Sequence, residues 1–318
     1  MNVKPPIKIP AKNLKSIRYS GLKGRIVHYP ATTKAKQTFV IIAGQHGSHE
    51  RMLSFIEFLA DYGDVYSIDM PGFGGMNSFA SIGKPISHES YAEYLYAVLK
   101  TQKLTSNITI FAVSIGGQFA TRMMQMYPDS QKWVKTFVGF VTFGAGKDFC
   151  MKHPYRGIAR ALAVANSNPI SLPIFKLLVF NRLSVRAFLH VFSLFKRKMK
   201  SNDPAMRKKS IEMEFYHWMM NDRRTHAKTT LLAFNEDLRV KTDELIKVPM
   251  RHILTANDQY VDDKEVNKTF RDLFSNYTPH YLTLGVHMPS AMGGKADIAK
   301  LFSQELIDEI IDVKGSAK

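Results

Sequence analysis

The sequence predicts an α/β fold with a mostly parallel central sheet, because short apolar segments typical of strands alternate with helical segments along the chain. One basic, helical stretch interrupts this alternation and indicates an insertion. Strands are expected at 37–44, 64–70, 107–113, 133–144, 248–257 and 280–284. Helices are expected at 50–63, 89–103, 116–127, 263–274 and about 295–313. Strands that are linked by helices run parallel, and the helices cover both faces of their sheet.

The first half of the chain shows each element in turn. The first strand is QTFVIIAG, which is rich in β-branched and aromatic residues and ends at a glycine. In the helix that follows, apolar residues recur at helical spacing before Gly63, at Met52, Phe55, Ile56 and Leu59. The segments DVYSIDM and ESYAEYLYAVLKTQK repeat this strand and helix pattern. They are followed by NITIFAV, GGQFATRMMQMY and WVKTFVGFVTFG, which we interpret as strand, helix and strand.

The alternation resumes after the insertion with VPMRHILTAN, a helical stretch, HYLTL and a last helix. We therefore predict a core domain formed by 1–147 and 236–318, and a helical cap formed by 148–235. Residues 149–235 hold 16 Lys or Arg and 4 Asp or Glu, and no acidic residue occurs in 149–202. Such a concentration of positive charge suggests a segment that faces something anionic, although a solvated basic face without a partner is the alternative.

Composition excludes several classes of protein. The chain has 318 residues, of which 45% are hydrophobic and 22% charged, as in a globular protein with a substantial core. Its single cysteine, Cys150, excludes an intramolecular disulfide framework and fits a reducing compartment. The N-terminal segment is basic but lacks the apolar stretch of a signal peptide, and no apolar run reaches the ~18 residues of a spanning helix. We expect a cytoplasmic protein, with peripheral membrane contact as an open alternative.

Ser114 lies where a predicted strand turns into a predicted helix. A nucleophile at such an elbow needs small residues around it, because side chains in so tight a turn would collide with their neighbours. Gly116 and Gly117 follow the serine, and Ala112 stands where a first glycine is usual. The helix dipole and the backbone N–H of Ile115 would stabilise an oxyanion. We predict Ser114 as a nucleophile; a helix-capping serine is the alternative.

A serine nucleophile needs a base that is held by an acid. His287 follows the strand predicted at 280–284, and Asp258 follows the strand before it. The carboxyl ends of parallel strands meet at one edge of a sheet, so the two side chains and Ser114 are expected to come together. Competing acids for the same role are Asp148, Asp262 and Asp263.

These motifs together resemble the α/β-hydrolase superfamily, and in particular its esterase, lipase and thioesterase branch. The segment SIGGQFATRMMQMYP (114–128) is similar to the serine-glycine-glycine helix of that family. The segment VYSIDMPGFGGMNS (65–78) is similar to the family's second-strand signature, and 231–262 is similar to the passage that leads to its catalytic acid. The resemblance covers nearly the whole chain outside the insertion. It implies an α/β-hydrolase fold with an inserted helical cap.

The resemblance also implies a second oxyanion donor in a His-Gly-x motif after the first strand. The chain contains HGS at 46–48, but the family's spacing before Asp69 favours AGQ at 43–45. The backbone N–H of Gln45 is therefore the predicted second donor, and Ser48 is the alternative.

The predicted activity is that of a serine hydrolase that cleaves a carboxylic ester through an acyl-enzyme, with His287 as the base and Asp258 as its acid. The same triad could carry acyl transfer, thioester cleavage or C–C bond hydrolysis, and a non-catalytic ligand-binding protein on this fold is a further alternative. No cofactor and no metal are expected, since the histidines of HGSHE (46–50) are interpreted as the start of a helix.

The substrate prediction depends on the insertion. Segment 170–200 is apolar and aromatic, with Arg182, Arg186 and His190 spaced to share one helix face. It suits either a cap over a medium or long acyl chain, as in a lysophospholipid or monoacylglycerol, or a helix resting on anionic lipid. A cap helix with an incidentally basic exterior is the alternative. Nucleic acid is not an expected partner, because no nucleic-acid-binding motif is visible.

Overall fold

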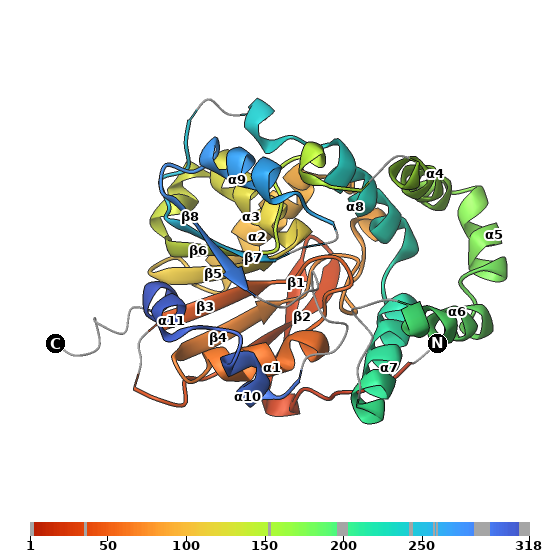
Figure 1. Cartoon of the computed structure of the whole chain (residues 1–318), viewed down its shortest axis with the longest axis horizontal. Helices are drawn as coiled ribbons and strands as arrows, with labels where there is room; N and C mark the ends of the chain where they lie inside the picture. The colour runs from red at the N-terminus through yellow and green to blue at the C-terminus, as the bar shows by residue number, and fades with distance from the viewer. Residues whose placement is uncertain are drawn as a thin grey trace.

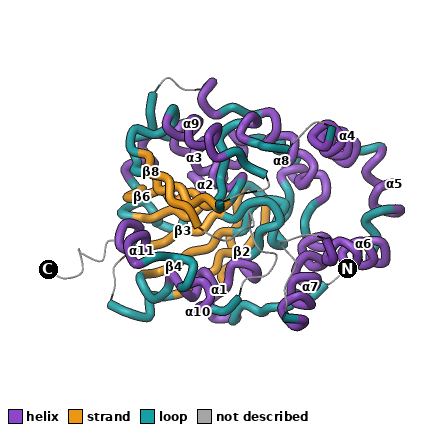
Figure 2. The backbone as a smooth tube through the Cα atoms, viewed as in Figure 1, coloured by secondary structure: helices purple, strands orange, loops and turns teal. Residues whose placement is uncertain are grey.

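A computed structural model describes residues 3–34, 37–151, 154–195, 203–241, 244–256, 258, 260–282 and 293–311. Within these residues the chain forms a central sheet flanked by helices, with a group of helices projecting at one side (Figure 1). Figure 2 shows the same arrangement, with the strands enclosed between helices.

The described strands form one eight-stranded sheet in the order β1-β2-β4-β3-β5-β6-β7-β8. The strands from β3 onward pair in parallel, and β1 and β2 add an antiparallel edge. Their bounds are β1 Leu14–Tyr19, β2 Leu22–Tyr29, β3 Gln37–Ile42, β4 Gly63–Ile68, β5 Ile108–Val113, β6 Val134–Phe140, β7 Met250–Thr255 and β8 Tyr277–Leu282. The mostly parallel sheet predicted from the alternating pattern is confirmed.

The hairpin of β1 and β2 was not among the predicted elements. Its two-residue turn is formed by Ser20 and Gly21, which both have positive φ angles, 46° and 87°. Such angles suit the turns whose twist matches that of hairpin strands. The dipeptide Ser20-Gly21 between β-branched and aromatic residues is the signal that could have revealed it.

Helices cover both faces of the sheet. On one face α2 (His88–Thr101), α3 (Ile115–Met126) and α9 (Asp263–Arg271) enclose a core that contains Tyr91, Phe119 and Phe270. On the other face α1 (His49–Leu59), α10 (Lys295–Ala299) and α11 (Gln304–Ile310) enclose a second core. The strand β5, whose residues are all buried, lies between these two cores.

Two predicted boundaries at the C-terminal end were wrong. The last strand begins at Tyr277 rather than His280, because it pairs with β7 over its whole length. The helix predicted at 295–313 is interrupted, and α10 and α11 are separate. Ser303 caps the second helix by accepting a hydrogen bond from the Leu306 N–H, and a new helix starts there.

A helical insertion lies between β6 and β7, as the sequence predicts. It comprises α4 (Tyr155–Ser167), α5 (Ser171–Leu178), α6 (Arg182–Phe195), α7 (Pro204–Met220) and α8 (Arg223–Asn235). In Figure 1 these helices form an arc at the right of the sheet. The limits 148–235 for this cap stay a prediction. Among the described helices, none has the length and apolar character needed to cross a bilayer.

Candidate active site

The structure places Ser114 at a sharp turn between β5 and α3. Its φ of 52° and ψ of −128° lie outside the regions that residues with a side chain ordinarily adopt. Such a conformation costs free energy and persists only where the surroundings hold it in place. The main-chain torsions at Ser114 are therefore those of a strained elbow.

Three hydrogen bonds hold this turn. The Ser114 N–H donates to the Phe140 carbonyl at 2.9 Å. Its own carbonyl accepts from the Gly117 N–H at 2.9 Å and from the Thr142 hydroxyl at 2.7 Å. Since Phe140 and Thr142 belong to β6 and the residues after it, the neighbouring strand fixes the elbow.

The two glycines after Ser114 are required by close packing. A Cβ on Gly116 would lie 2.8 Å from the carbonyl oxygens of Ile42 and Ala43, and one on Gly117 would lie 1.9 Å from the Thr142 hydroxyl. The obstacle at Gly116 is backbone, which cannot move aside as a flexible side chain could. This agrees with the reason for which small residues were expected there.

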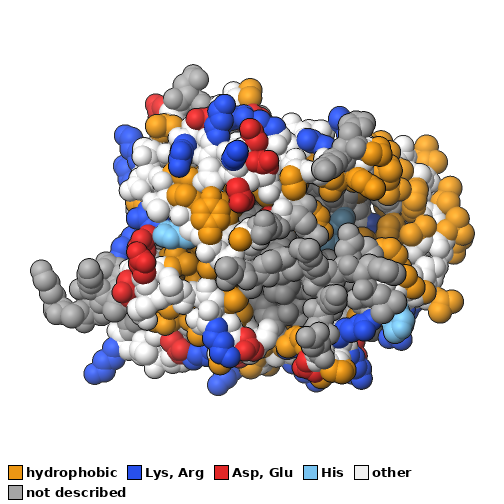
Figure 3. Space-filling view, viewed as in Figure 1, with side chains coloured by type: hydrophobic (Ala, Val, Ile, Leu, Met, Phe, Trp, Pro, Cys, Tyr) orange, Lys and Arg blue, Asp and Glu red, His pale blue; other side chains and the backbone are white. Residues whose placement is uncertain are grey.

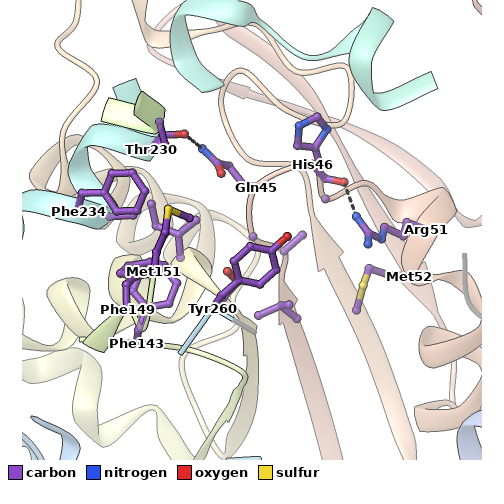
Figure 4. Close-up of a pocket in the computed structure, with 18 residues that line it drawn as sticks. Gln45, His46, Arg51, Met52, Phe143, Phe149, Met151, Thr230, Phe234 and Tyr260 are labelled. Atoms are coloured by element: carbon purple, nitrogen blue, oxygen red, sulfur yellow. Dashed lines mark hydrogen bonds between the residues drawn. The ribbon is translucent and has the colours of Figure 1, made fainter. Parts of the chain in front are cut away.

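The loop after β3 lies against Ser114. A Cβ on Gly44 would come within 3.0 Å of the Ser114 Cβ and 2.6 Å of the Val113 carbonyl oxygen. The next residue, Gln45, is anchored to the cap: its side-chain amide donates to the His226 carbonyl and to the hydroxyls of Thr229 and Thr230 on α8, at 2.8, 2.8 and 2.9 Å, respectively. Figure 4 shows the bond from Gln45 to Thr230.

Ser48, the alternative to Gln45, has a different place. Its hydroxyl caps α1 by accepting from the Arg51 N–H and lies 2.9 Å from the His217 Nε2. The prediction that HGSHE starts a helix is confirmed, because α1 begins at His49. Within the described part of the chain, no group of three His, Cys, Asp or Glu side chains is placed to hold a metal ion.

A cavity of about 320 Å³ lies in front of the elbow. Ser114, Ile115 and Gln45 are in its wall, so the predicted nucleophile and both predicted oxyanion donors face one space. In Figure 4 a group of apolar side chains occupies one side of this cavity, with His46 and Arg51 opposite; the apolar residues are Phe143, Phe149, Met151 and Phe234.

Arg51 was not predicted as part of the site. Burial lowers the pKa of this guanidinium, and the negative charge of Glu214 on α7 opposes the shift. Its neighbour in the wall, His46, has a positive φ of 55°. The His46 ring makes a tilted contact with Trp218 and an edge-on contact with His226 of the cap. Sequence spacing carries no signal for these contacts, because they join the first loop to helices more than a hundred residues later.

A second cavity, of about 530 Å³, lies within the cap. Its walls are mostly apolar and come from α4, α5, α6 and α8 and the residues between them. Ala159 on α4 and Thr230 on α8 line both cavities, so the two spaces adjoin at these residues.

Asp258 follows the end of β7, as expected. Its carboxylate accepts from the Tyr260 N–H at 2.8 Å and from the Thr255 hydroxyl at 3.2 Å. Burial and the charge of Asp258 both raise the pKa of the Cys150 thiol, whose sulfur lies 3.9 Å from the Asp258 carbonyl oxygen. Asp258 therefore lies at the carboxyl edge of the sheet, in a partly buried position.

The competing acids have other partners. The Asp148 carboxylate is fully buried and accepts from the Gly144 and Ala145 N–H groups, each at 2.8 Å, and from the Thr269 hydroxyl at 2.7 Å. Burial raises the pKa of Asp148, and these hydrogen bonds oppose the shift. Asp262 caps α9, accepting from the N–H groups of its first turn. Asp263 is the first residue of α9, and burial beside Asp258 raises its pKa.

His287, the predicted base, lies outside the described residues. The strand that precedes it, β8, ends at Leu282 and pairs in parallel with β7. The edge at which Asp258 is found is thus the edge at which the chain leaves β8 toward His287. The catalytic pairing of Ser114, His287 and Asp258 stays a prediction.

The sequence matches the family described as serine aminopeptidase, S33, over residues 33–289. No curated protein matches it. Among solved structures, the chain is similar to an esterase from Exiguobacterium antarcticum, with 15% identity, a TM-score of 0.65, and coverage of 92% of this chain and 96% of that chain.

It is also similar to an N-formylmaleamic acid deformylase from Pseudomonas putida S16, with 13% identity, a TM-score of 0.64, and coverage of 91% and 100%. A third similar structure is an esterase from a Rhodococcus species, with 16% identity, a TM-score of 0.58, and coverage of 94% and 98%. At such low identity the likeness shows the fold alone, and the predicted α/β-hydrolase fold is confirmed. By its family match and its architecture, the chain belongs to the serine aminopeptidase S33 family of the α/β-hydrolase superfamily.

Proposed function

We propose that this protein is a serine hydrolase that cleaves a carboxylic ester with a medium or long acyl chain. The observation that carries the proposal is the strained elbow at Ser114, which opens into a cavity whose wall also contains Gln45 and Ile115. Strain of this kind is retained where function requires it, and it exposes a serine hydroxyl at the carboxyl edge of the sheet.

In the proposed reaction, His287 removes the proton from the Ser114 hydroxyl as its oxygen attacks the ester carbonyl. The negative oxygen of the tetrahedral intermediate accepts hydrogen bonds from the N–H groups of Ile115 and Gln45. Ile115 is the first residue of α3, where backbone N–H groups have no acceptor within the helix. His287 then protonates the leaving alcohol, and a water that it deprotonates releases the acid from Ser114.

The acyl chain is assigned to the second cavity. This cavity adjoins the Ser114 cavity at Ala159 and Thr230, and its walls are mostly apolar side chains. Burial of each methylene group stabilises the bound chain by about 0.8 kcal/mol, so a longer chain gains affinity until the cavity is full. A cavity of 530 Å³ lies in the range of sites that enclose a small organic ligand.

A fluorophosphonate probe tests the nucleophile, because it reacts with activated serines. We expect the native protein to be labelled and Ser114→Ala to be unlabelled, with Ser48→Ala as a matched control that keeps the label. Labelling that persists in Ser114→Ala would contradict the proposal. A folded native protein that takes no label would favour a non-catalytic binding protein.

A panel of p-nitrophenyl esters tests the acyl chain. We expect kcat/KM to rise from acetate to medium and long chains, since only the longer chains reach the second cavity. Activity on acetate alone would contradict the assignment of that cavity. The cytoplasmic location stays a prediction.

A further inference from the structure

The outer surface of the cap carries an exposed apolar face formed by α4, α5 and α6. The exposed fractions of its large apolar side chains range from 47% to 81%. Side chains of this size usually occur singly on the surface of a soluble domain, and a contiguous group marks an interaction site. In Figure 3 these hydrophobic side chains gather along the right edge of the molecule, over α4–α6.

Helix α5 shows the feature most clearly. Its sequence is SLPIFKLL, and none of its residues is buried. Ile174 and Leu177 on the helix, together with Ile170 just before it, are 57%, 73% and 81% exposed. An apolar helix of this kind would ordinarily be packed against a core, because its exposure to water is unfavourable.

Helix α6 combines apolar and cationic residues on its exposed side. Leu183 and Val191 are 80% and 57% exposed, and eight residues apart they share one helix face. The cationic residues Arg182 and Arg186 are also exposed. They border that face, since they lie about 100° and about 60° of helical rotation from Leu183. The basic stripe predicted from the sequence is thus at the surface and borders the apolar face.

The charge of this region has one sign. Arg160, Lys176, Arg182 and Arg186 are exposed on α4–α6, and no acidic residue occurs anywhere in 149–202. A second copy of this chain is therefore a poor partner, because a symmetric contact would bring the same cations together. The complement of such a face is a surface that is both apolar and anionic.

The mouth of the cap cavity opens in the same face. Leu162, Leu178 and Phe188 line that cavity and are at the same time 51%, 65% and 53% exposed. One continuous set of apolar side chains thus leads from the surface of the cap to the wall shared with the Ser114 cavity.

We propose that the exposed face of α4–α6 docks on the surface of a bilayer that contains anionic lipid. Its apolar side chains insert between the headgroups, and its Lys and Arg side chains attract the lipid phosphates and carboxylates. Docking itself does not depend on catalysis. Its consequence for substrate entry, that an acyl chain passes from the bilayer into the cavity mouth, rests on the proposed function.

Co-sedimentation with vesicles tests the docking. The Ser114→Ala protein is used, so that no lipid is consumed and a failure of the proposed catalysis leaves the result intact. We expect binding to vesicles of phosphatidylcholine with phosphatidylserine at low ionic strength, and at least about fivefold weaker binding to pure phosphatidylcholine vesicles. High salt should weaken the binding, because it screens exposed charges.

Matched variants identify the face. Ile170→Asp combined with Leu183→Asp should abolish sedimentation, whereas Val240→Asp should not, although Val240 on the core domain is as exposed, at 80%, as Leu183. Likewise Lys176→Glu should weaken binding at least about fivefold, and Lys132→Glu on the core domain should weaken it less. Circular dichroism checks that each variant is folded, which is expected since all five substituted sites are exposed.

Two results would overturn the proposal. One is sedimentation of the Ile170→Asp, Leu183→Asp protein equal to that of the parent. The other is a mass by light scattering that shows a dimer in the parent and a monomer in this variant, because the face would then be covered by a second copy.

Discussion

Gln45 has two separable contributions at the site. Its side chain joins the loop after β3 to α8 through three hydrogen bonds, while its backbone N–H is the proposed oxyanion donor. The two can be distinguished because proline removes the N–H and alanine removes only the side chain.

We expect Gln45→Pro to lower kcat by about 10²-fold or more, since one oxyanion donor is lost. Gln45→Ala should lower kcat far less, although it frees α8 from the loop. Ester hydrolysis measured on both folded variants checks this. Equal losses in the two would show that the side chain, and not the N–H, is what matters.

The two aspartates beside the site are expected to differ in their effect. Asp258→Asn should lower kcat by about 10³–10⁴-fold, because an amide holds the wrong tautomer of the base. Asp148→Asn should instead lower the free energy of unfolding by about 1–3 kcal/mol, because the buried carboxylate accepts three hydrogen bonds. Turnover assays and urea denaturation of both variants separate the effects. The assignment fails if only Asp148→Asn abolishes turnover.

At the scale of the element, β7 contains a titratable group that faces inward. His252 is fully buried, packs against Phe270 and lies 3.0 Å from the Tyr277 hydroxyl through Nδ1. Burial lowers the pKa of His252 to about 3, because the charged imidazolium would lose its hydration. The folded protein therefore holds this ring neutral over the range in which an unfolded chain would protonate it.

This shift predicts an acid-sensitive stability. Above about pH 6.5 the histidine is neutral in both states, and as the pH falls toward about 3 only the unfolded state binds a proton. The free energy of unfolding should then decrease by up to about 1.4 kcal/mol per pH unit from this group alone. Urea denaturation between pH values of about 7.5 and 5 should show a smaller decrease for His252→Gln than for the native protein. An equal decrease in both would contradict the prediction.

The elements also show which local signals were informative. The strands and helices that were recognised by apolar segments ending at a glycine were predicted well, because the apolar pattern and the terminating glycine both lie within the segment itself. The division of the last helix into α10 and α11 depends on Ser303, whose role as a helix cap was not recognised in the sequence. The first hairpin was not predicted because few of its residues are buried and their burial does not alternate strictly along β1 and β2, so no strong apolar pattern marks these strands.

On the scale of the whole molecule, the relation between core and cap decides which substrates reach Ser114. Ala159 and Thr230 line both cavities, and Ala159 is the smaller of the two. A larger side chain at position 159 would therefore narrow the junction between the cavities. We expect Ala159→Trp to reduce kcat/KM for long-chain esters about tenfold or more, while acetate hydrolysis is retained, because the indole fills the junction.

The matched control is Ala161→Trp, which places the same side chain on the exposed side of α4. Its ester profile should equal that of the native protein. If Ala159→Trp also leaves the profile unchanged, the second cavity does not receive the acyl chain.

The sequence by itself determined the α/β fold, the order of its parallel strands along the chain, the insertion and the turn at Ser114. These depend on local requirements: apolar periodicity, and small residues where a Cβ would strike backbone at Gly116. Only the tertiary structure decided how closely Gly44 lies against Ser114, that α8 anchors the Gln45 side chain, and that α5 is left without a buried residue. Each of these is a contact, or a missing contact, between segments far apart in the chain, and an apolar helix has the same sequence pattern whether its face is covered by protein or exposed.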